Sequence, residues 1–397
     1  MSLSVEVRVP FLDLRAQYAS IKDEIDEAVH AVLASGHYVG GEWVERFEHE
    51  FSQFVGAERA VAVSSGTAAL ELAFRAADIR ADDEVIVPAN SFFATAEAVS
   101  NMGATPVFAD VNPQTFHLDP ASVESHLTPR TRAIVPVHLY GRVADLTEIE
   151  RLAKTFSLEI IEDACQAHGV RRNGIHVGGS GRLTCFSFYP GKNLGAYGDG
   201  GAVTCNDPKQ AQLIRTLRDH GSPVKYQHVA IGTNSRLDGI QAAILCLKLR
   251  HLDAWNARRF CHAESYIRAL HECKIELPVL PPEGEHNFHL FVIRKEQRDT
   301  MKTFLHQRGI ETGIHYPISL HLTPAYQALG YPGLGSLPAA ERLAGEILSL
   351  PMYPELTQDQ INIVVSAVEE FCSIAETKSR VFAVSEQNHR LPSGVPP

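Results

Sequence analysis

Between residues 58 and 206 the chain alternates short apolar runs, rich in β-branched residues, with segments of helical or turn character. The runs are almost continuously hydrophobic, which is typical of strands buried on both faces of a sheet. Such alternation predicts an α/β domain with a mostly parallel sheet. The seven predicted strands are RAVAVSS (59–65), DEVIVPA (83–89), TPVFADV (105–111), AIVPVHLYG (133–141), LEIIEDA (158–164), LTCFSFYP (183–190) and GGAVTCN (200–206).

Downstream of Asn206 the pattern changes to longer segments of helical character. Apolar residues recur at helical spacing from Leu237 to Leu247. Ser235 followed by Asp238 predicts a capping box that starts this helix. The other predicted elements are a helix over 15–34, a strand over 287–294, a helix over 298–310 and a C-terminal helix over 357–376.

A chain of 397 residues with two patterns of this kind predicts two domains. We expect an N-terminal arm and a large domain with a seven-stranded sheet over residues 1–244. A smaller α+β domain is expected over residues 245–378. The final segment, 379–397, ends in a polar stretch rich in proline and glycine, which predicts a disordered tail.

Composition is that of a globular enzyme, with 45% hydrophobic and 21% charged residues. The formal charge of −11 disfavours a nucleic-acid or membrane partner, and no apolar run approaches the roughly 20 residues of a membrane helix. Charged residues near the N-terminus argue against a signal peptide. The seven scattered cysteines, without a C-x-x-C motif, favour a reduced cytoplasmic protein over a disulfide framework or a metal site.

One lysine, Lys192, lies in the small-sided loop that follows the strand over 183–190. It could cradle a phosphate, lie on the surface as a solvated charge, or bond covalently to a ligand. A Walker-type phosphate loop is excluded, because that motif needs Ser or Thr after the lysine and this chain has Asn193. Taken alone, the surface charge is the ordinary interpretation.

Two other sequence features favour the covalent role. Asp163 ends a predicted strand, and ligands of open α/β sheets bind beyond the carboxyl ends of strands. The predicted strand over 59–65 runs into Gly66 and Thr67 at a helix start, where free N–H groups bind anions. Each feature alone is also typical of a turn or a helix cap. Together they supply a lysine for a Schiff base, a carboxylate for a ring nitrogen and a phosphate nest, as pyridoxal 5'-phosphate (PLP) requires.

At these motifs the chain resembles the PLP-dependent sugar aminotransferases of the DegT/DnrJ/EryC1/StrS group, which have the aspartate aminotransferase fold (fold type I). The resemblance runs from VPFLDLRAQY (9–18) to LPMYPELT (350–357). The other segments that carry it include VAVSSGTAAL, ANSFFATA, PVHLYG, IEDACQAHG, FSFYPGKNLGAYGDGGAV, GTNSRLDGIQAAIL and GIHYPISLHLTPAY. Some members of the group replace the lysine with histidine and act as dehydratases, so the presence of Lys192 favours transamination.

The resemblance implies a role for each matching residue. Lys192 forms the Schiff base and moves the proton, and Asp163 pairs with the pyridinium nitrogen. Gln166 reaches the ring hydroxyl, and Phe92 stacks on the ring, with Phe93 as the fallback. The residues implied at the phosphate are Gly66, Thr67, Ser187 and, from the second subunit of a homodimer, Asn234. The residues implied on the sugar side are Tyr189, His315, Tyr316 and His321, with Lys225 and Arg236 as further candidates.

The resemblance also implies a substrate and an amino donor. L-glutamate is the expected donor, and a dTDP-linked 3-keto-6-deoxyhexose is the expected acceptor, giving an amino sugar for an antibiotic or a cell-surface polysaccharide. The same chemistry on a 4-keto nucleotide sugar or a cyclitol ketone is the alternative. Two other classes stay open, a PLP-binding regulator without catalysis and a structural α/β protein without a cofactor. The regulator lacks a visible DNA-binding module.

Overall fold

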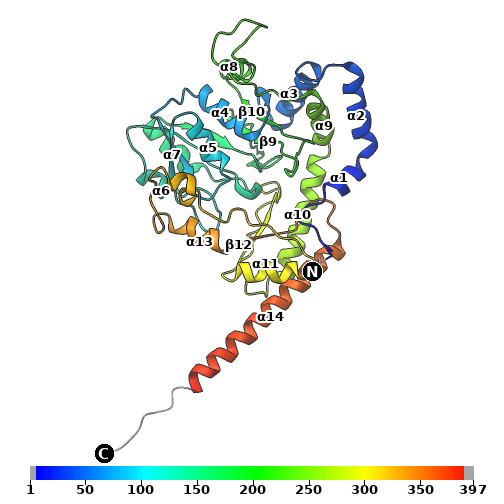
Figure 1. Ribbon diagram of the computed structural model, residues 1–397, viewed down its shortest axis with the longest axis vertical. Coiled ribbons are helices and arrows are strands. Elements are labelled where there is room, and N and C mark those ends of the chain that lie inside the picture. The colour runs from blue at the N-terminus through cyan, green and yellow to red at the C-terminus, as the bar shows by residue number, and fades with distance from the viewer. Residues whose placement is uncertain (1–5, 389–397) are drawn as a thin grey trace, which may run out of the picture.

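The computed structural model describes residues 6–388, and their side chains as far as Ile374. Figure 1 shows a body of helices around a central sheet, from which the C-terminal helix α14 projects. The helices are α1 (Leu14–Ser20), α2 (Lys22–Ser35), α3 (Glu42–Val55), α4 (Gly66–Ala76), α5 (Ala94–Asn101), α6 (Pro120–Ser125), α7 (Thr147–Phe156), α8 (Pro208–Arg218), α9 (Gly239–Leu249), α10 (Leu252–Leu270), α11 (Arg298–His306), α12 (Pro324–Gln327), α13 (Pro338–Glu346) and α14 (Gln358–Asn388).

The central sheet consists of two hydrogen-bonded ladders. In the first, β2 (Glu84–Pro88) pairs in parallel with β3 (Thr105–Ala109) and with β4 (Thr131–Ile134), which pairs in parallel with β5 (Glu159–Ile160). In the second, β6 (Glu162–Asp163) pairs in parallel with β9 (Thr184–Ser187). The antiparallel strand β10 (Gly201–Cys205) then joins β9 to β1 (Arg59–Val63).

The two ladders form one sheet, because only Ile161 separates β5 from β6. The Ile161 N–H donates to the Ile134 carbonyl at 3.1 Å, and Val137 bridges in parallel to Asp163. Within the described residues the strand order is therefore β3-β2-β4-β5/β6-β9-β10-β1, with β10 as the antiparallel strand. This confirms the predicted mostly parallel sheet of seven strands.

Apolar side chains cover both faces of this sheet. Val61 and Val63 of β1 pack on one face with Leu70 of α4, in a core that also includes buried residues of α5. Ala60 and Ala62 point to the other face and pack with Phe47 and Phe51 of α3 and with α9. Alternate strand residues thus serve opposite cores, which explains why the runs read as continuously hydrophobic.

The C-terminal part packs around a separate hydrophobic core. This core joins α10, α11 and α14 to a two-stranded antiparallel ladder of β11 (Phe291–Arg294) and β12 (Ile347–Leu350). The predicted domain boundary at residue 245 falls inside α9, whose Leu245 and Leu249 are buried against the large sheet. A division after α9 therefore fits the packing better than the predicted one.

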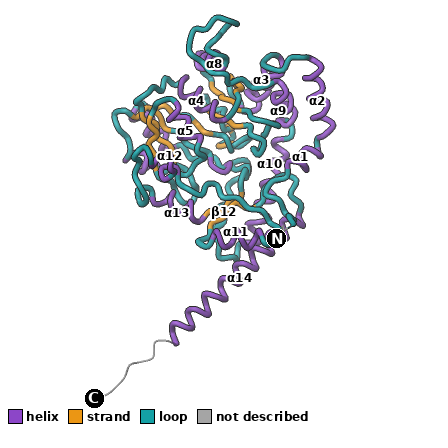
Figure 2. The backbone as a smooth tube through the Cα atoms, in the orientation of Figure 1, coloured by secondary structure: helices purple, strands orange, loops and turns teal. Residues whose placement is uncertain are grey.

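Three short hairpin or turn elements complete the fold. They are the ladder of β7 (Arg171–Arg172) with β8 (Ile175–His176) and the 3₁₀ turns η1 (Leu139–Gly141) and η2 (Leu320–Leu322). Figure 2 shows that loops occupy much of the region between the sheet and the C-terminal helices. No described helix has the length and apolarity needed to cross a membrane.

Two sequence predictions differ from the structure. Helix α9 begins at Gly239, so Ser235 does not start it. The Ser235 backbone instead pairs with Ser64 and Arg218, at 2.9 Å each, which holds it extended. Helix α14 continues to Asn388, into the predicted disordered tail, and its extension contains no proline or glycine. The rest of that tail, residues 389–397, lies outside the described residues.

Candidate active site

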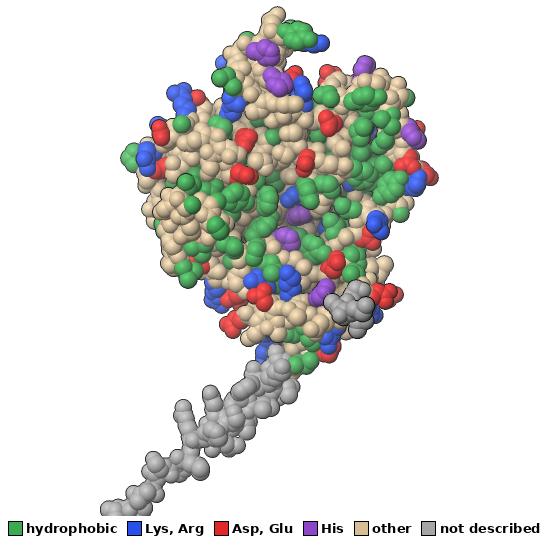
Figure 3. Space-filling view, viewed as in Figure 1, with side chains coloured by type: hydrophobic (Ala, Val, Ile, Leu, Met, Phe, Trp, Pro, Cys, Tyr) green, Lys and Arg blue, Asp and Glu red, His purple; other side chains and the backbone are tan. Residues whose placement is uncertain are grey.

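A cavity of about 620 Å³ opens at the carboxyl ends of the parallel strands. Segments that follow β1, β2, β6 and β9 form its floor, and segments of the C-terminal part and the N-terminal arm close it. In Figure 3, histidine side chains lie near the centre of the face shown, while basic and acidic side chains are interspersed around them. The predicted site residues in the cavity wall are Gly66, Thr67, Phe92, Asp163, Gln166, Ser187, Tyr189, Lys192, His315 and Tyr316.

Lys192 lies in the wall of this cavity. Its backbone N–H donates to the Tyr189 carbonyl at 2.8 Å, which closes a tight turn after β9. Burial lowers the pKa of the Lys192 amine, and the nearby Cys165 and Asp163 oppose that shift. A lowered pKa increases the fraction of neutral amine, the form that attacks a carbonyl carbon. Lys192 is therefore not the solvated surface charge of the ordinary interpretation.

Asp163 is 5% exposed and ends β6. One carboxylate oxygen, Oδ2, accepts from Thr95 Oγ1 at 2.8 Å, and Oδ1 accepts from the Cys165 N–H at 3.1 Å. Among the residues that the structure describes, no cationic side chain forms an ion pair with it. A buried carboxylate normally has a charged partner. The geometry thus fits a protonated ring nitrogen in the cavity.

The start of α4 offers an anion-binding site beside Asp163. Ser65 caps the helix by accepting the Ala68 N–H with its hydroxyl, at 3.1 Å, and the Ala69 N–H with its carbonyl. The N–H groups of Gly66 and Thr67 have no acceptor within the helix. A Cβ at Gly66 would lie 2.7 Å from the Cβ of Ser187, so glycine is needed for this close approach.

The two neighbouring phenylalanines after β2 lie in different environments. Phe92 is 54% exposed, lines the cavity and has its ring centre 5.6 Å from that of Tyr316. Phe93 is partly buried and packs against Tyr326 in the hydrophobic core. The structure therefore favours Phe92 over Phe93 as the aromatic residue at the cofactor.

The buried Gln166 and the half-buried Tyr316 form a polar pair in the cavity wall. The Gln166 Oε1 accepts the Tyr140 N–H at 2.6 Å, so its Nε2 is the donor, 3.3 Å from the Tyr316 hydroxyl. Burial and the charge of Asp163 raise the pKa of Tyr316. Both side chains thus present neutral hydrogen-bonding groups to a ligand.

His315 lies beside Tyr316 and is fixed from two sides. Its Nδ1 is 2.9 Å from Ser349 Oγ, and its ring stacks on Phe11 with 5.5 Å between ring centres. Burial, with a smaller contribution from Lys192, lowers the pKa of His315 to about 4. The imidazole is therefore neutral near pH 7. Tyr189 is 59% exposed at the mouth of the cavity.

His321 does not reach the cavity, contrary to the prediction. It is 1% exposed, and its Nε2 is 3.1 Å from Glu341 Oε1. The 3₁₀ turn η2 points this side chain into the protein, so His321 has a structural role instead of the predicted sugar contact. Two other candidates also lie elsewhere, since Arg236 pairs with Asp219 at 2.7 Å and Lys225 lies near the Tyr226 ring.

Asn234 is exposed and does not line the cavity of its own chain. It forms an antiparallel bridge with Asp219 at the base of the loop after α8. Figure 1 shows this loop projecting from the body. Asn234 therefore has no contact with the cavity of its own chain, and its predicted role stays a prediction.

Several cavity residues carry no signal in the sequence that singles them out. Thr95 is a hydroxyl residue in the first turn of α5, Ser91 lies in the segment before that helix, and Phe11 lies in the N-terminal arm. His289 is one of 19 histidines. Its Nδ1 is 3.1 Å from Asn193 Oδ1, and burial together with Lys192 lowers its pKa well below the usual range.

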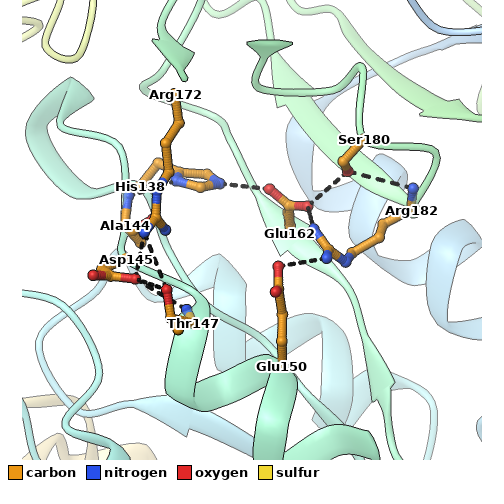
Figure 4. Close-up of polar contacts among 9 residues, drawn as sticks. All are labelled: His138, Ala144, Asp145, Thr147, Glu150, Glu162, Arg172, Ser180 and Arg182. Atoms are coloured by element: carbon orange, nitrogen blue, oxygen red, sulfur yellow. Dashed lines mark hydrogen bonds and ion pairs between the residues drawn. The ribbon is translucent and has the colours of Figure 1, made fainter. Parts of the chain in front are cut away.

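The opposite face of β6 carries a second polar cluster, shown in Figure 4. Glu162 Oε2 is 2.9 Å from His138 Nε2, and its Oε1 accepts from Ser180 Oγ and from Arg182, each at 3.1 Å. Arg182 also contacts Glu150 at 2.6 Å. Burial alone would raise the pKa of Glu162, but its hydrogen bonds and charge interactions with His138 and Arg182 lower it. This cluster is closed on itself and lies outside the cavity.

Comparisons with known proteins agree with this geometry. The chain is 48% identical over 367 residues to a dTDP-3-amino-3,4,6-trideoxy-alpha-D-glucose transaminase of Streptomyces venezuelae, covering 92% of this chain and 96% of that protein. The crystal structure of S. venezuelae DesV with a ketimine intermediate matches with a TM-score of 0.90 and 48% identity, over 92% of this chain and 99% of that one. NtdA of Bacillus subtilis, with the bound cofactor PMP, matches with a TM-score of 0.86 and 34% identity, over 94% and 86%.

The fold, the cavity and these matches define a PLP-dependent aminotransferase of fold type I. The chain belongs to the DegT/DnrJ/EryC1/StrS aminotransferase family, whose profile matches residues 19–369. The predicted family, fold and cofactor are thereby confirmed. The named sugar aminotransferases among the relatives support an enzyme, so the alternative of a structural protein without a cofactor is not supported.

Proposed function

We propose that this protein transfers the amino group of L-glutamate to the keto carbon of a dTDP-linked 3-keto-6-deoxyhexose. The observation that carries the proposal is one cavity that combines Lys192, Asp163 and the free N–H groups at the start of α4. The name of the S. venezuelae relative supports the substrate class. The product would be an amino sugar for an antibiotic or a cell-surface polysaccharide.

When bound, PLP supplies an electron-accepting ring that stabilises negative charge at the carbon beside the transferred nitrogen. The Lys192 amine, with its lowered pKa, would be the nucleophile that forms the Schiff base with PLP. The same amine would then move the proton between the substrate carbon and the cofactor. Asp163 would hold the proton on the ring nitrogen. Gln166 Nε2 would donate toward the ring hydroxyl, and Phe92 would cover one ring face.

The phosphate end and the sugar end of the cavity use different groups. The Gly66 and Thr67 N–H groups and the Ser187 hydroxyl would hold the phosphate. Neutral side chains at the other end, His315 and Tyr316 inside and Tyr189 at the mouth, match sugar hydroxyls, which donate and accept hydrogen bonds. This arrangement suits a polar, uncharged sugar ring.

The exposed loop after α8 supports a homodimer with shared active sites. Tyr226, Val229 and Ile231 in this loop are 80%, 71% and 88% exposed. Apolar side chains gathered in a projecting loop are typical of a protein interface. We propose that the loop packs on a second copy and brings Asn234 to the phosphate of the partner's cofactor.

We also propose that the enzyme works in the cytoplasm. The seven cysteines all lie within the part of the chain that has described side chains, and no disulfide joins them. Proteins of oxidising compartments commonly form disulfides, whereas those of the reducing cytosol keep their thiols.

Substrate choice is tested by mixing the purified enzyme, PLP and L-glutamate with either the 3-keto or the 4-keto dTDP-6-deoxyhexose. Mass spectrometry should detect the amino sugar from the 3-keto compound, with a kcat/KM at least roughly 100-fold above that for the 4-keto isomer. Product formed only from the 4-keto sugar would replace the proposed substrate with its alternative. L-alanine in place of L-glutamate checks the donor.

Subunit sharing is tested by mixing two inactive variants, Lys192→Ala and Asn234→Ala. A hybrid dimer contains one site with both substitutions and one intact site, so activity should return. Mixtures in which each variant is combined with itself should stay inactive. A mixture without recovered activity, despite subunit exchange shown by differential labelling, would contradict a shared site.

A further inference from the structure

The carboxylate of Asp163 is the end of a short chain of hydroxyl groups. Thr95, in the first turn of α5, places Oγ1 2.8 Å from Asp163 Oδ2. Ser91, in the segment between β2 and α5, places Oγ 2.8 Å from Thr95 Oγ1. Ser91, Thr95 and Asp163 are 2%, 1% and 5% exposed, so bulk water hardly competes for these bonds.

The chemistry of the three groups fixes the direction of the hydrogen bonds that link them. An ionised carboxylate can only accept hydrogen bonds, so the Thr95 hydroxyl donates to Asp163. A hydroxyl has one hydrogen to donate, so Thr95 must accept from Ser91. Both hydroxyls thus point their hydrogens toward the carboxylate. Hydrogen bonds to a charged acceptor are the stronger kind, and linked bonds reinforce one another at low dielectric.

These hydrogen bonds connect separate parts of the sheet. Asp163 ends β6, whereas Ser91 and Thr95 follow β2, and β4 lies between these strands. The second carboxylate oxygen, Oδ1, accepts from the Cys165 N–H at 3.1 Å. With one donor on each oxygen, the plane of the carboxylate is fixed, and its remaining lone pairs are available toward the cavity that it lines.

We propose that Thr95, supported by Ser91, is a positioning residue that orients the Asp163 carboxylate toward the ring nitrogen of the cofactor. The proposal rests on the proposed role of Asp163. It assigns Thr95 no contact with the reacting atoms. Its effect is on how tightly the protein holds PLP, before any substrate is added.

The decisive variant is Thr95→Val, which replaces the hydroxyl with a methyl group of similar size. Thr95→Ser restores the donor, and Ser91→Ala removes only the supporting bond. Thr204→Val is the matched control, because Thr204 is also fully buried but donates to the Gly178 carbonyl, and it does not line the cavity. Equilibrium affinity for PLP is measured on each apo-protein by absorbance, alongside its thermal unfolding without cofactor.

We expect Thr95→Val to weaken PLP binding by roughly ten- to a hundredfold, the range of one hydrogen bond to a charged group. Thr95→Ser should bind PLP within about threefold of wild type, and Ser91→Ala should fall between the two. Thr204→Val should change the unfolding temperature without changing the affinity. If Thr95→Val is too unstable to measure, the weakened binding of Ser91→Ala carries the test.

Two results would overturn the proposal. In the first, Thr95→Val binds PLP as wild type does. In the second, Thr95→Ser is as impaired as Thr95→Val, which would show that packing and not the hydroxyl matters. A wild-type protein that fails to bind PLP would sink the proposed function as well, whereas the first two results leave that function standing.

Discussion

Two neighbouring acids of β6 show how differently one strand can use the same chemical group. Glu162 and Asp163 are 3% and 5% exposed, and they point to opposite faces of the sheet. Glu162 is surrounded by His138, Ser180 and Arg182, whereas Asp163 receives two neutral donors and, within the described residues, no cation. Burial alone therefore does not distinguish a structural acid from a functional one.

The difference lies in how the negative charge is compensated. The protein's own cationic and polar groups compensate the charge of Glu162, so its ion pairs and hydrogen bonds stabilise the folded state (Figure 4). Asp163 keeps lone pairs toward a cavity that also contains Lys192. The charge of Asp163 would instead be compensated by a cationic group of a bound ligand. Variants on the two faces should accordingly separate catalysis from stability.

The largest expected effect is on the cavity side, at Lys192. Lys192→Ala should lower kcat by at least ~10⁴-fold, because it removes both the nucleophile and the group that moves the proton. Lys154→Ala, at an exposed lysine of α7, serves as the control and should keep full activity. Steady-state assays with L-glutamate check this, and substantial turnover by Lys192→Ala would contradict the assignment.

Asp163→Asn should have the next largest effect. The substitution keeps the size of the side chain but removes the charge that holds the proton on the ring nitrogen, so we expect kcat to fall by roughly 10²–10³-fold. Thermal unfolding of the apo-protein should change little, since the lost charge has no ion-pair partner among the described residues. Near-normal kcat in this variant would remove Asp163 from the mechanism.

The counterpart on the other face is Glu162→Gln, which should act on stability. It removes the acid that contacts the buried His138 and the half-buried Arg182, which keeps its contact with Glu150, and breaking a buried pair costs up to about 3–5 kcal/mol. Because the pKa of Glu162 is lowered in the folded state, its contribution is present above the ordinary glutamate pKa and is lost as pH falls through the folded value.

Urea unfolding checks the Glu162 prediction. The stability difference between wild type and Glu162→Gln should be full at pH 7 and shrink as pH falls below about 4. Activity per folded molecule should stay within a few-fold of wild type. A variant that is as stable as wild type but inactive would reverse the proposed division of roles between the two faces.

Much of the fold could be predicted from the sequence, because strands buried on both faces leave unmistakable apolar runs. All seven predicted strands are present, in the runs where they were expected. The prediction that a helix starts at Ser235 was wrong, because backbone hydrogen bonds of Ser235 with Ser64 and Arg218 override the local capping pattern. The tail was predicted to be disordered from its composition, but residues that are compatible with a helix extend α14 to Asn388.

The position of a site residue was predictable where it depends on strand ends and motif, as for Lys192 and Asp163, which line one cavity. His321 shows the limit, since the motif gives its position in the chain but η2 turns its side chain toward Glu341. Thr95 and Ser91 were missed because a hydroxyl residue in or just before the first turn of a helix is usually a cap or a turn residue. The role inferred for them appears only when β2 and β6 are placed in one sheet.

The most direct test of the account is the absorbance spectrum of the purified protein with PLP, before and after addition of L-glutamate. A lysine-bound cofactor should absorb near about 415 nm, and amino transfer should move the band to about 330 nm. Lys192→Ala, measured in parallel, should lack the wild-type response. A protein that stays colourless with PLP would contradict the central role of Lys192 and the cavity, and a coloured protein unchanged by L-glutamate would contradict the proposed donor.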